Sequence, residues 1–277
     1  MDGPDRRFRR GQSYRPVFPG CQLNFFRFNG YDMYLPYFGL ARSPFGIAPD
    51  PDFLYLSPQH GEALAHLRYG IGQRKGIVVL TGEVGCGKTT LLQALLRELP
   101  ARKYRKIILK NPTVDLVDLY GQILHELGLP GDSRSPLALL DQVSDALRRY
   151  ERAGRDIVLV IDEAQNLSAQ MLEQLRLLSN LETKDHRILQ IALVGQPELR
   201  KMLRKKELRQ LRQRIPVYYD LRPLRFLETV KYINYRLAYA GSSGGVKFSL
   251  AATGAIHRAA KGIPRVINGL CDRALLS

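Results

Sequence analysis

The stretch GEVGCGKTT, residues 82–90, decides the fold. It matches the pattern G-x-x-x-x-G-K-[ST] through Gly82, Gly87, Lys88 and Thr89, between the apolar run IVVL and the helical run LLQALLREL. A glycine loop between a strand and a helix lets backbone N–H groups surround phosphate oxygens, where the helix dipole favours anions. The stretch therefore predicts a strand, a phosphate loop and a helix that bind ATP or GTP.

Two side chains of this loop have predicted roles of their own. Lys88 is expected to reach the β- and γ-phosphates, and Thr89 to place its hydroxyl on Mg²⁺. Cys86 occupies a variable position and is interpreted as filler, with a redox-sensitive thiol as the alternative. The loop residues expected to surround the nucleotide are Gly82, Glu83, Val84, Gly85, Cys86, Gly87, Lys88, Thr89 and Thr90.

Composition favours a globular protein of the cytoplasm. The chain has 277 residues, of which 45% are hydrophobic, and this is enough for one large α/β domain or for a core with a smaller attachment. The longest aliphatic run, IVLVI at 157–161, falls far short of the ~20 residues that span a bilayer. The arginine-rich start excludes a signal peptide. The three widely spaced cysteines are typical of a reduced cytosolic protein, and the five histidines show no zinc-ligand spacing.

The formal charge of +16 is concentrated in three segments. Residues 1–32 carry a net +3, residues 97–110 carry +5 and residues 201–214 carry +6. Such clustering favours a polyanion such as DNA, or an anionic membrane surface, as a partner. The alternatives for 201–214 are a solvated face, or arginines that meet the nucleotide of a neighbouring subunit.

The order of elements predicts an α/β fold with a parallel sheet, because buried strands alternate with helices along the chain. Residues 1–32 show no periodicity and are expected to be disordered, with Met33 as a hypothetical natural start. Ser57-Pro58 indicates a helix start, with the helix reaching about Tyr69. After 223 every pattern is helical. Strands are expected at 76–81, 106–110, 188–195 and 217–221, and the stretch DIVLVIDEAQ at 156–165 is expected to begin as a fully buried strand. Helices are expected up to 99 and at 115–127, 136–152, 168–182 and towards 213.

VLVIDEAQ is the second informative stretch, because two carboxylates follow four apolar residues at the end of a strand. Asp162 is expected to hold the Mg²⁺ coordination shell, and Glu163 to orient and activate the attacking water. With the phosphate loop upstream, the pair favours hydrolysis over simple nucleotide binding.

Weaker patterns add candidates for sensing the phosphates. LVGQPEL places Gln196 at the end of the next strand, and GIPR places Arg265 in the helical C-terminal part. LRQLRQRI offers Arg209, Arg212 and Arg214 as a finger inserted into a neighbour's site, with Arg214 preferred.

In this order, the motifs resemble those of an AAA+ ATPase. More narrowly, MYLPYFGLARSPFGIAPDPDFLYLSPQHGEALAHLRYGI, LTGEVGCGKTTLL, VIDEAQNLSAQMLEQLRLLSNLET and LVGQPELR resemble the ExeA-like, general secretion pathway protein A family, from Met33 to the last residue. The resemblance implies a P-loop AAA+ three-layer sandwich with a parallel sheet, followed by a small all-helical lid. It also implies ATP and not GTP, Mg²⁺, and a homo-oligomer or ring.

The resemblance also assigns residues. It implies phosphate and metal contacts for Lys88 and Thr89, a metal contact for Asp162, a catalytic role for Glu163 and a lid sensor at Arg265. The segment from Tyr55 to His60 would flank the adenine. Gln196 departs from the Asn, Ser or Thr commonest at its position. The expected parts are the extension 1–32, the AAA+ core 33–223 and the lid 224–277.

The task of the ATPase has three interpretations. Family members typically continue into a membrane span and a periplasmic peptidoglycan-binding region, and this chain, which ends in CDRALLS, is expected to be a fragment with a truncated lid or a shortened member. The first interpretation is an assembly factor for a secretion or envelope machine, associated with the inner membrane if the protein continues. The second is a DNA-binding AAA+ ATPase that regulates transposition or another DNA transaction. The third is a slow nucleotide-gated switch.

Overall fold

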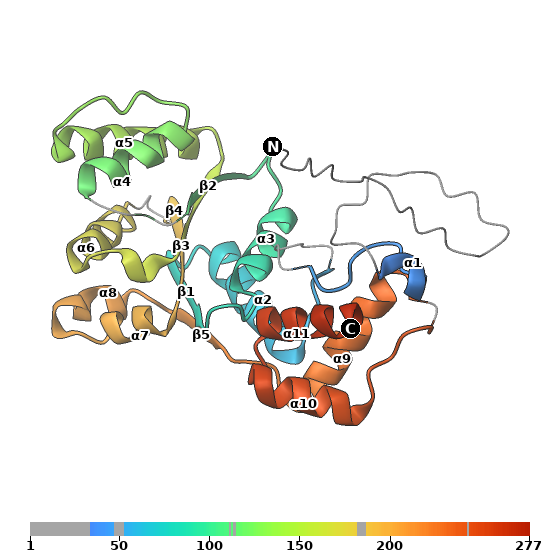
Figure 1. The fold of residues 1–277 in the computed structure, drawn as a ribbon. Coiled ribbons are helices and arrows are strands. Elements are labelled where there is room, and N and C mark those ends of the chain that lie inside the picture. The colour runs from blue at the N-terminus through green and yellow to red at the C-terminus, as the bar shows by residue number, and fades with distance from the viewer. Residues whose placement is uncertain (1–33, 47–52, 111, 113–114, 182–186, 243) are drawn as a thin grey trace, which may run out of the picture. The chain divides into compact units, whose positions relative to one another are not determined.

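The structure is a computed structural model that describes residues 34–46, 53–110, 112, 115–181, 187–242 and 244–277 (Figure 1). The extension predicted over 1–32 and the hypothetical start at Met33 lie outside the described residues. The chain divides into two units, Met1–Met33 and Tyr34–Ser277, and all described residues belong to the second.

Five parallel strands form one sheet in the order β2-β3-β4-β1-β5. The central strands are apolar runs that are buried along their whole length, as expected for a parallel sheet covered on both faces. This confirms the predicted fold class. The strands are β1 (Ile77–Gly82), β2 (Tyr104–Lys110), β3 (Asp156–Asp162), β4 (Leu189–Gly195) and β5 (Val217–Leu221).

Helices cover both faces, because successive strand residues point to opposite sides. Ile77 and Val79 of β1 belong to one hydrophobic cluster, whereas Val78 and Leu80 belong to another. The first cluster lies under α4 to α8 and the second under α2 and α3, which gives three layers (Figure 1). The helices are α2 (Pro58–Gly72), α3 (Lys88–Glu98), α4 (Leu116–Glu126), α5 (Pro136–Arg152), α6 (Ala169–Leu178), α7 (Pro197–Leu203) and α8 (Arg209–Gln213), with the short 3₁₀ turns η2 (Ala164–Asn166) and η3 (Lys206–Leu208).

The helix ends follow from local chemistry. Ser57 is the N-cap of α2, since its hydroxyl accepts from the backbone N–H of His60, and Pro58 occupies the first turn. This confirms the predicted start. The helix predicted over 168–182 ends earlier, at Leu178, because the Ser179 hydroxyl donates to the Arg176 carbonyl and the chain leaves the helix in a turn.

The C-terminal helices share a third hydrophobic cluster with the first described segment of the chain. This lid cluster contains Tyr34, Leu40, Phe45 and Phe53 together with apolar residues of the helices. It therefore combines residues from both sides of position 223, where the sequence predicts the boundary between core and lid. The elements are α1 (Leu35–Phe38), α9 (Phe226–Tyr239), α10 (Leu250–Ala260) and α11 (Pro264–Leu276). None of the helices in the described part of the chain combines the length and apolar character needed to cross a membrane.

Candidate nucleotide site

The predicted site residues meet at one edge of the sheet, where parallel strands end together. The phosphate loop follows β1, Asp162 is the last residue of β3 with Glu163 directly after it, and Gln196 directly follows β4. β1 pairs with β4, and β4 with β3, so the three strand ends are neighbours in the sheet. Sheet topology therefore brings together chemistry that is spread over more than 100 residues of sequence.

The phosphate loop depends on two glycines. Gly85 has φ +82° and Gly87 has φ +96°, which side chains other than glycine adopt only with strain. A Cβ on Gly85 would lie 2.7 Å from the Cβ of Arg265, and one on Gly87 would lie 3.1 Å from Nε2 of His60. The loop is therefore shaped both by its own backbone and by residues packed against it.

Lys88 begins α3 and turns its ammonium back onto the loop. Its Nζ donates to the carbonyl oxygens of Gly82, at 2.8 Å, and Glu83, at 3.0 Å. Burial lowers the pKa of Lys88, although the carboxylates of Glu163 and Asp162 act in the opposite direction. A buried ammonium in this position is available to an anion at the loop.

Thr89 and Asp162 form the candidate metal pair. The Thr89 hydroxyl donates to Oδ2 of Asp162 at 3.1 Å, and Oδ1 of Asp162 accepts from the backbone N–H of Glu163 at 3.0 Å. A hydroxyl and a carboxylate are oxygen donors of the kind that Mg²⁺ takes, with phosphates and waters as its other ligands. The donor set therefore fits the predicted ion.

Glu163 is held by two glutamine side chains. Its Oε2 accepts from Nε2 of Gln165 at 2.6 Å and from Nε2 of Gln196 at 3.0 Å. Its backbone lies in the left-handed region, with φ +55°, a strained conformation often found at functional sites. Partial burial raises the pKa of Glu163, but these hydrogen bonds and the charges of Lys88 and Arg265 outweigh it, so the net pKa is lowered. The carboxylate is ionised at neutral pH.

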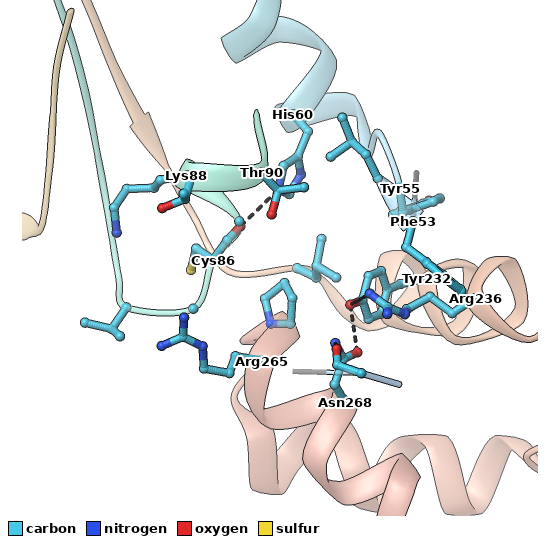
Figure 2. A pocket seen from close by; sticks show the side chains of 18 of the residues that line it. Phe53, Tyr55, His60, Cys86, Lys88, Thr90, Tyr232, Arg236, Arg265 and Asn268 are labelled. Carbon is cyan, nitrogen blue, oxygen red and sulfur yellow. Dashed lines mark hydrogen bonds between the residues drawn. The ribbon is translucent and has the colours of Figure 1, made fainter. Parts of the chain in front are cut away.

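A pocket of about 900 Å³, including its open mouth, joins the phosphate loop to the lid (Figure 2). Most of the wall opposite the loop comes from the lid helices and from the segment before α2. The lining residues are Gly46, Phe53, Leu54, Tyr55, His60, Val84 to Thr90, Glu163, Leu224, Tyr232, Arg236, Pro264, Arg265 and Asn268.

The lid contacts the phosphate loop directly. The backbone N–H of Arg265, in the first turn of α11, donates to the Gly85 carbonyl at 3.2 Å. Further into the lid, Tyr232 donates to Oδ1 of Asn268 at 2.7 Å, as Figure 2 shows, and Nδ2 of Asn268 donates to the Gly46 carbonyl at 3.3 Å. This network ties α9, α11 and the segment before α2 into one wall.

The predicted residues fall into two groups. Tyr55 and Arg265 line the pocket, and Gln196 reaches it through its bond to Glu163. Cys86 packs in the cluster under α2 and α3, and burial raises the pKa of its thiol to about 11, so it is uncharged at neutral pH. The second group consists of the cations Arg209, Arg212 and Arg214. They lie in and just after α8, are exposed, and do not line this pocket.

Sequence reasoning missed several residues of the site. Gln165 lies in the DEAQ stretch itself, but its contact with Glu163 depends on the turn after β3. Tyr232, Arg236 and Asn268 are polar residues on otherwise apolar, buried helix faces. A polar residue in an apolar stripe is a signal that can be read from sequence, because burial of such a group requires a partner.

Two comparisons of sequence bear on this arrangement. A family model described as an AAA domain matches residues 71–203. The general secretion pathway protein A of Aeromonas hydrophila is 48% identical over 246 residues, which are 88% of this chain and 45% of that protein. The chain thus spans about half the length of this curated relative.

Solved structures show the same fold at low sequence identity. Cdc6p from Pyrobaculum aerophilum superposes with a TM-score of 0.65 at 17% identity, covering 83% of this chain and 65% of that one. The ORC1 protein of Aeropyrum pernix, solved in complex with DNA, gives 0.64 at 15% identity, covering 85% and 64%. A Walker-type ATPase of Pyrococcus abyssi gives 0.56 at 15% identity, covering 81% and 75%.

Proposed function

The chain belongs to the AAA+ ATPases, in the ExeA-like family of general secretion pathway protein A, and from this premise we propose that it hydrolyses ATP with Mg²⁺ as an oligomer. One observation carries the proposal. The phosphate loop, the Thr89–Asp162 pair and Glu163 meet at one sheet edge, beside a pocket that is closed on the other side by the lid. Hydrolysis requires these groups together, whereas nucleotide binding alone requires only the loop.

The residues have complementary roles in this proposal. Lys88 holds the β- and γ-phosphates as a point charge, and the loop amides bind phosphate oxygens. Thr89 and Asp162 hold Mg²⁺, which supplies charge neutralisation to the phosphates when bound. Glu163 accepts a proton from the attacking water, and its ionised state supports this role.

Two further residues link the phosphates to the rest of the molecule. Gln196 orients the Glu163 carboxylate and senses the γ-phosphate, which its 3.0 Å bond to Oε2 supports. Arg265 contacts the phosphates from the lid, which is supported by its place against Gly85 and its electrostatic effect on Glu163. Tyr55 flanks the base on the opposite wall.

Arg214 is proposed to act on a neighbouring subunit. It is exposed directly after α8, away from its own pocket, where a finger that completes another copy's site would have to lie. We expect Arg214→Ala to lower the ATP hydrolysis rate by at least about 10²-fold while the Kd for ATP changes little, because a finger stabilises charge in the transition state.

Mixing two inactive variants tests this assignment. In a mixed oligomer, a Glu163→Gln subunit still presents Arg214 to an Arg214→Ala neighbour that keeps its base. Hydrolysis should therefore return to a large fraction of the rate expected from the share of neighbouring pairs that combine the two variants in this way. Arg209→Ala and Arg212→Ala, in the helix α8 that precedes Arg214, are matched controls. Failure of the mixture to hydrolyse ATP, although wild-type subunits mixed with either variant exchange, would remove Arg214 as the finger.

The name of the relative assigns that protein to a general secretion pathway, and for this chain we propose that the task is assembly of a secretion or envelope machine. In this proposal the ATPase acts in the cytoplasm, at the inner membrane if the full-length protein continues. Hydrolysis would change how subunits pack against one another and against a protein partner.

DNA is the second candidate partner, favoured by one exposed basic face. In α7, η3 and α8 the leucines are buried, whereas the cations of the same segment are exposed. This basic face consists of Arg200, Lys201, Arg204, Lys205, Lys206, Arg209, Arg212 and Arg214. Exposed cations over one surface suit the closely spaced phosphates of duplex DNA.

Steady-state ATP hydrolysis with and without double-stranded DNA separates the two tasks. If the basic face binds DNA, we expect DNA to stimulate hydrolysis. With six or more phosphate contacts, the affinity for DNA should fall by about 10³-fold or more between 50 and 200 mM salt, and the stimulation should fade with it. Lys201→Glu combined with Lys205→Glu should remove the stimulation and leave basal hydrolysis unchanged. Hydrolysis that is indifferent to DNA at 50 mM salt would contradict this candidate and leave the assembly role.

A further inference from the structure

His60 is a buried polar side chain whose two ring nitrogens both have partners. It lies in the first turn of α2, is 4% exposed and lines the pocket. Its Nδ1 lies 2.7 Å from the hydroxyl of Ser57. Its Nε2 lies 3.0 Å from the carbonyl oxygen of Cys86 (Figure 2). A side chain of α2 therefore contacts the backbone of the phosphate loop.

The partners determine which nitrogen carries the proton. A carbonyl oxygen can only accept, so Nε2 must donate its hydrogen to Cys86. Burial lowers the pKa of His60, so the ring is neutral at pH 7 and its Nδ1 accepts from the Ser57 hydroxyl. The N-cap residue of α2 thus fixes the tautomer that holds the loop.

The loop needs such a contact because its own backbone is permissive. Gly87 lies at φ +96°, and glycines populate several backbone conformations at little cost. In a planar trans peptide the Cys86 carbonyl and the Gly87 N–H point in opposite directions. Holding the carbonyl towards α2 therefore turns the Gly87 N–H to the other side. A flip of this peptide would instead point an oxygen at the phosphate.

We infer that His60 is a positioning residue for the phosphate loop, whose Nε2–H holds the Cys86 carbonyl so that the Gly87 amide is presented to the phosphates of the bound nucleotide. This rests on the proposed nucleotide site. It explains why a polar ring is buried between α2 and the loop, where an apolar side chain would pack equally well but leave the carbonyl without a donor.

Four variants test the inference through the Kd values of ADP and of inorganic tripolyphosphate, both with Mg²⁺, by calorimetry. His60→Leu should weaken both ligands by about ten- to hundredfold, because a buried acceptor loses its donor. His60→Gln, whose amide reaches the position of Nε2, should recover to within about threefold of wild type. His60→Asn, one methylene shorter, should bind as weakly as His60→Leu. Leu67→Ala removes a buried side chain of the same helix, and should lower the melting temperature while leaving both Kd values unchanged.

The outcomes are distinguishable. Weaker ADP binding with unchanged tripolyphosphate binding would mean that His60 contacts the nucleoside, and would overturn the inference. So would equal affinities of the Gln and Asn variants, because the donor would then be irrelevant. If His60→Leu does not fold, the comparison of Gln with Asn still decides. A wild-type chain that binds neither ligand would overturn the proposed function itself, before any variant is compared.

Discussion

ATP binding by the Lys88→Ala variant is expected to fall by roughly 10²- to 10⁴-fold in Kd, from the 3 to 5 kcal/mol typical for removing one partner of a buried charge pair. The Lys88 ammonium is buried at the loop and donates to the Gly82 and Glu83 carbonyls, so its loss removes both a charge for the phosphates and a contact that shapes the loop. Calorimetric titration with ATP and Mg²⁺ measures the change, and hydrolysis should be undetectable.

The matched control is Lys201→Ala, which deletes the same side chain from the exposed surface of α7. It should bind ATP as the wild type does. Thermal melting should show that both variants are folded. A Kd of Lys88→Ala within threefold of the wild-type value would remove Lys88 from the phosphate site.

Hydrolysis by the Glu163→Gln variant is expected to fall by about 10²- to 10⁴-fold, the range typical for loss of a general base, while ATP binding is retained. The substitution is nearly isosteric, but an amide cannot accept the proton of the attacking water. The amide is also neutral, whereas in the wild type a charged carboxylate oxygen accepts hydrogen bonds from both Gln165 and Gln196. Single-turnover hydrolysis, with the Kd for ATP determined in parallel, separates the two effects.

The same change at Glu173 is the control, since this residue lies on α6 and pairs with Arg176. Glu173→Gln should leave the hydrolysis rate unchanged. Undiminished hydrolysis by Glu163→Gln would transfer the role of the base to another residue. A loss of ATP binding in the same variant would instead mean that Glu163 contributes to the ground state.

Much of the fold was predictable because local sequence patterns indicate its strands and helix starts. Buried strands such as IVLVI have no polar face, and Ser57-Pro58 is a strong helix start, so both were assigned correctly. The meeting of the phosphate loop with Asp162 follows from parallel strands that end at one edge. These inferences need only sequence period and topology.

The lid wall of the pocket was predictable only in part. Arg265 was found from GIPR, but Tyr232 and Asn268 were missed, because their place depends on how α9 packs against α11. The hydrogen bond from Gln165 to Glu163 depends on the backbone of Glu163, whose φ is +55°. Glutamate rarely adopts this conformation, so the sequence does not predict it. Contacts of this kind arise from tertiary packing and leave little trace in the local pattern.

The lid cluster described above makes this part of the protein discontinuous in sequence. Tyr34, Phe45 and Phe53 pack with Ile233 and Ile267, so the two ends of the described chain complete one hydrophobic core. A proteolytic cut before α2, or an excised fragment that starts there, would leave an apolar face on α9 and α11 open to water. The segment before α2 and the C-terminal helices therefore stabilise the same wall of the pocket together, through contacts that do not involve the sheet.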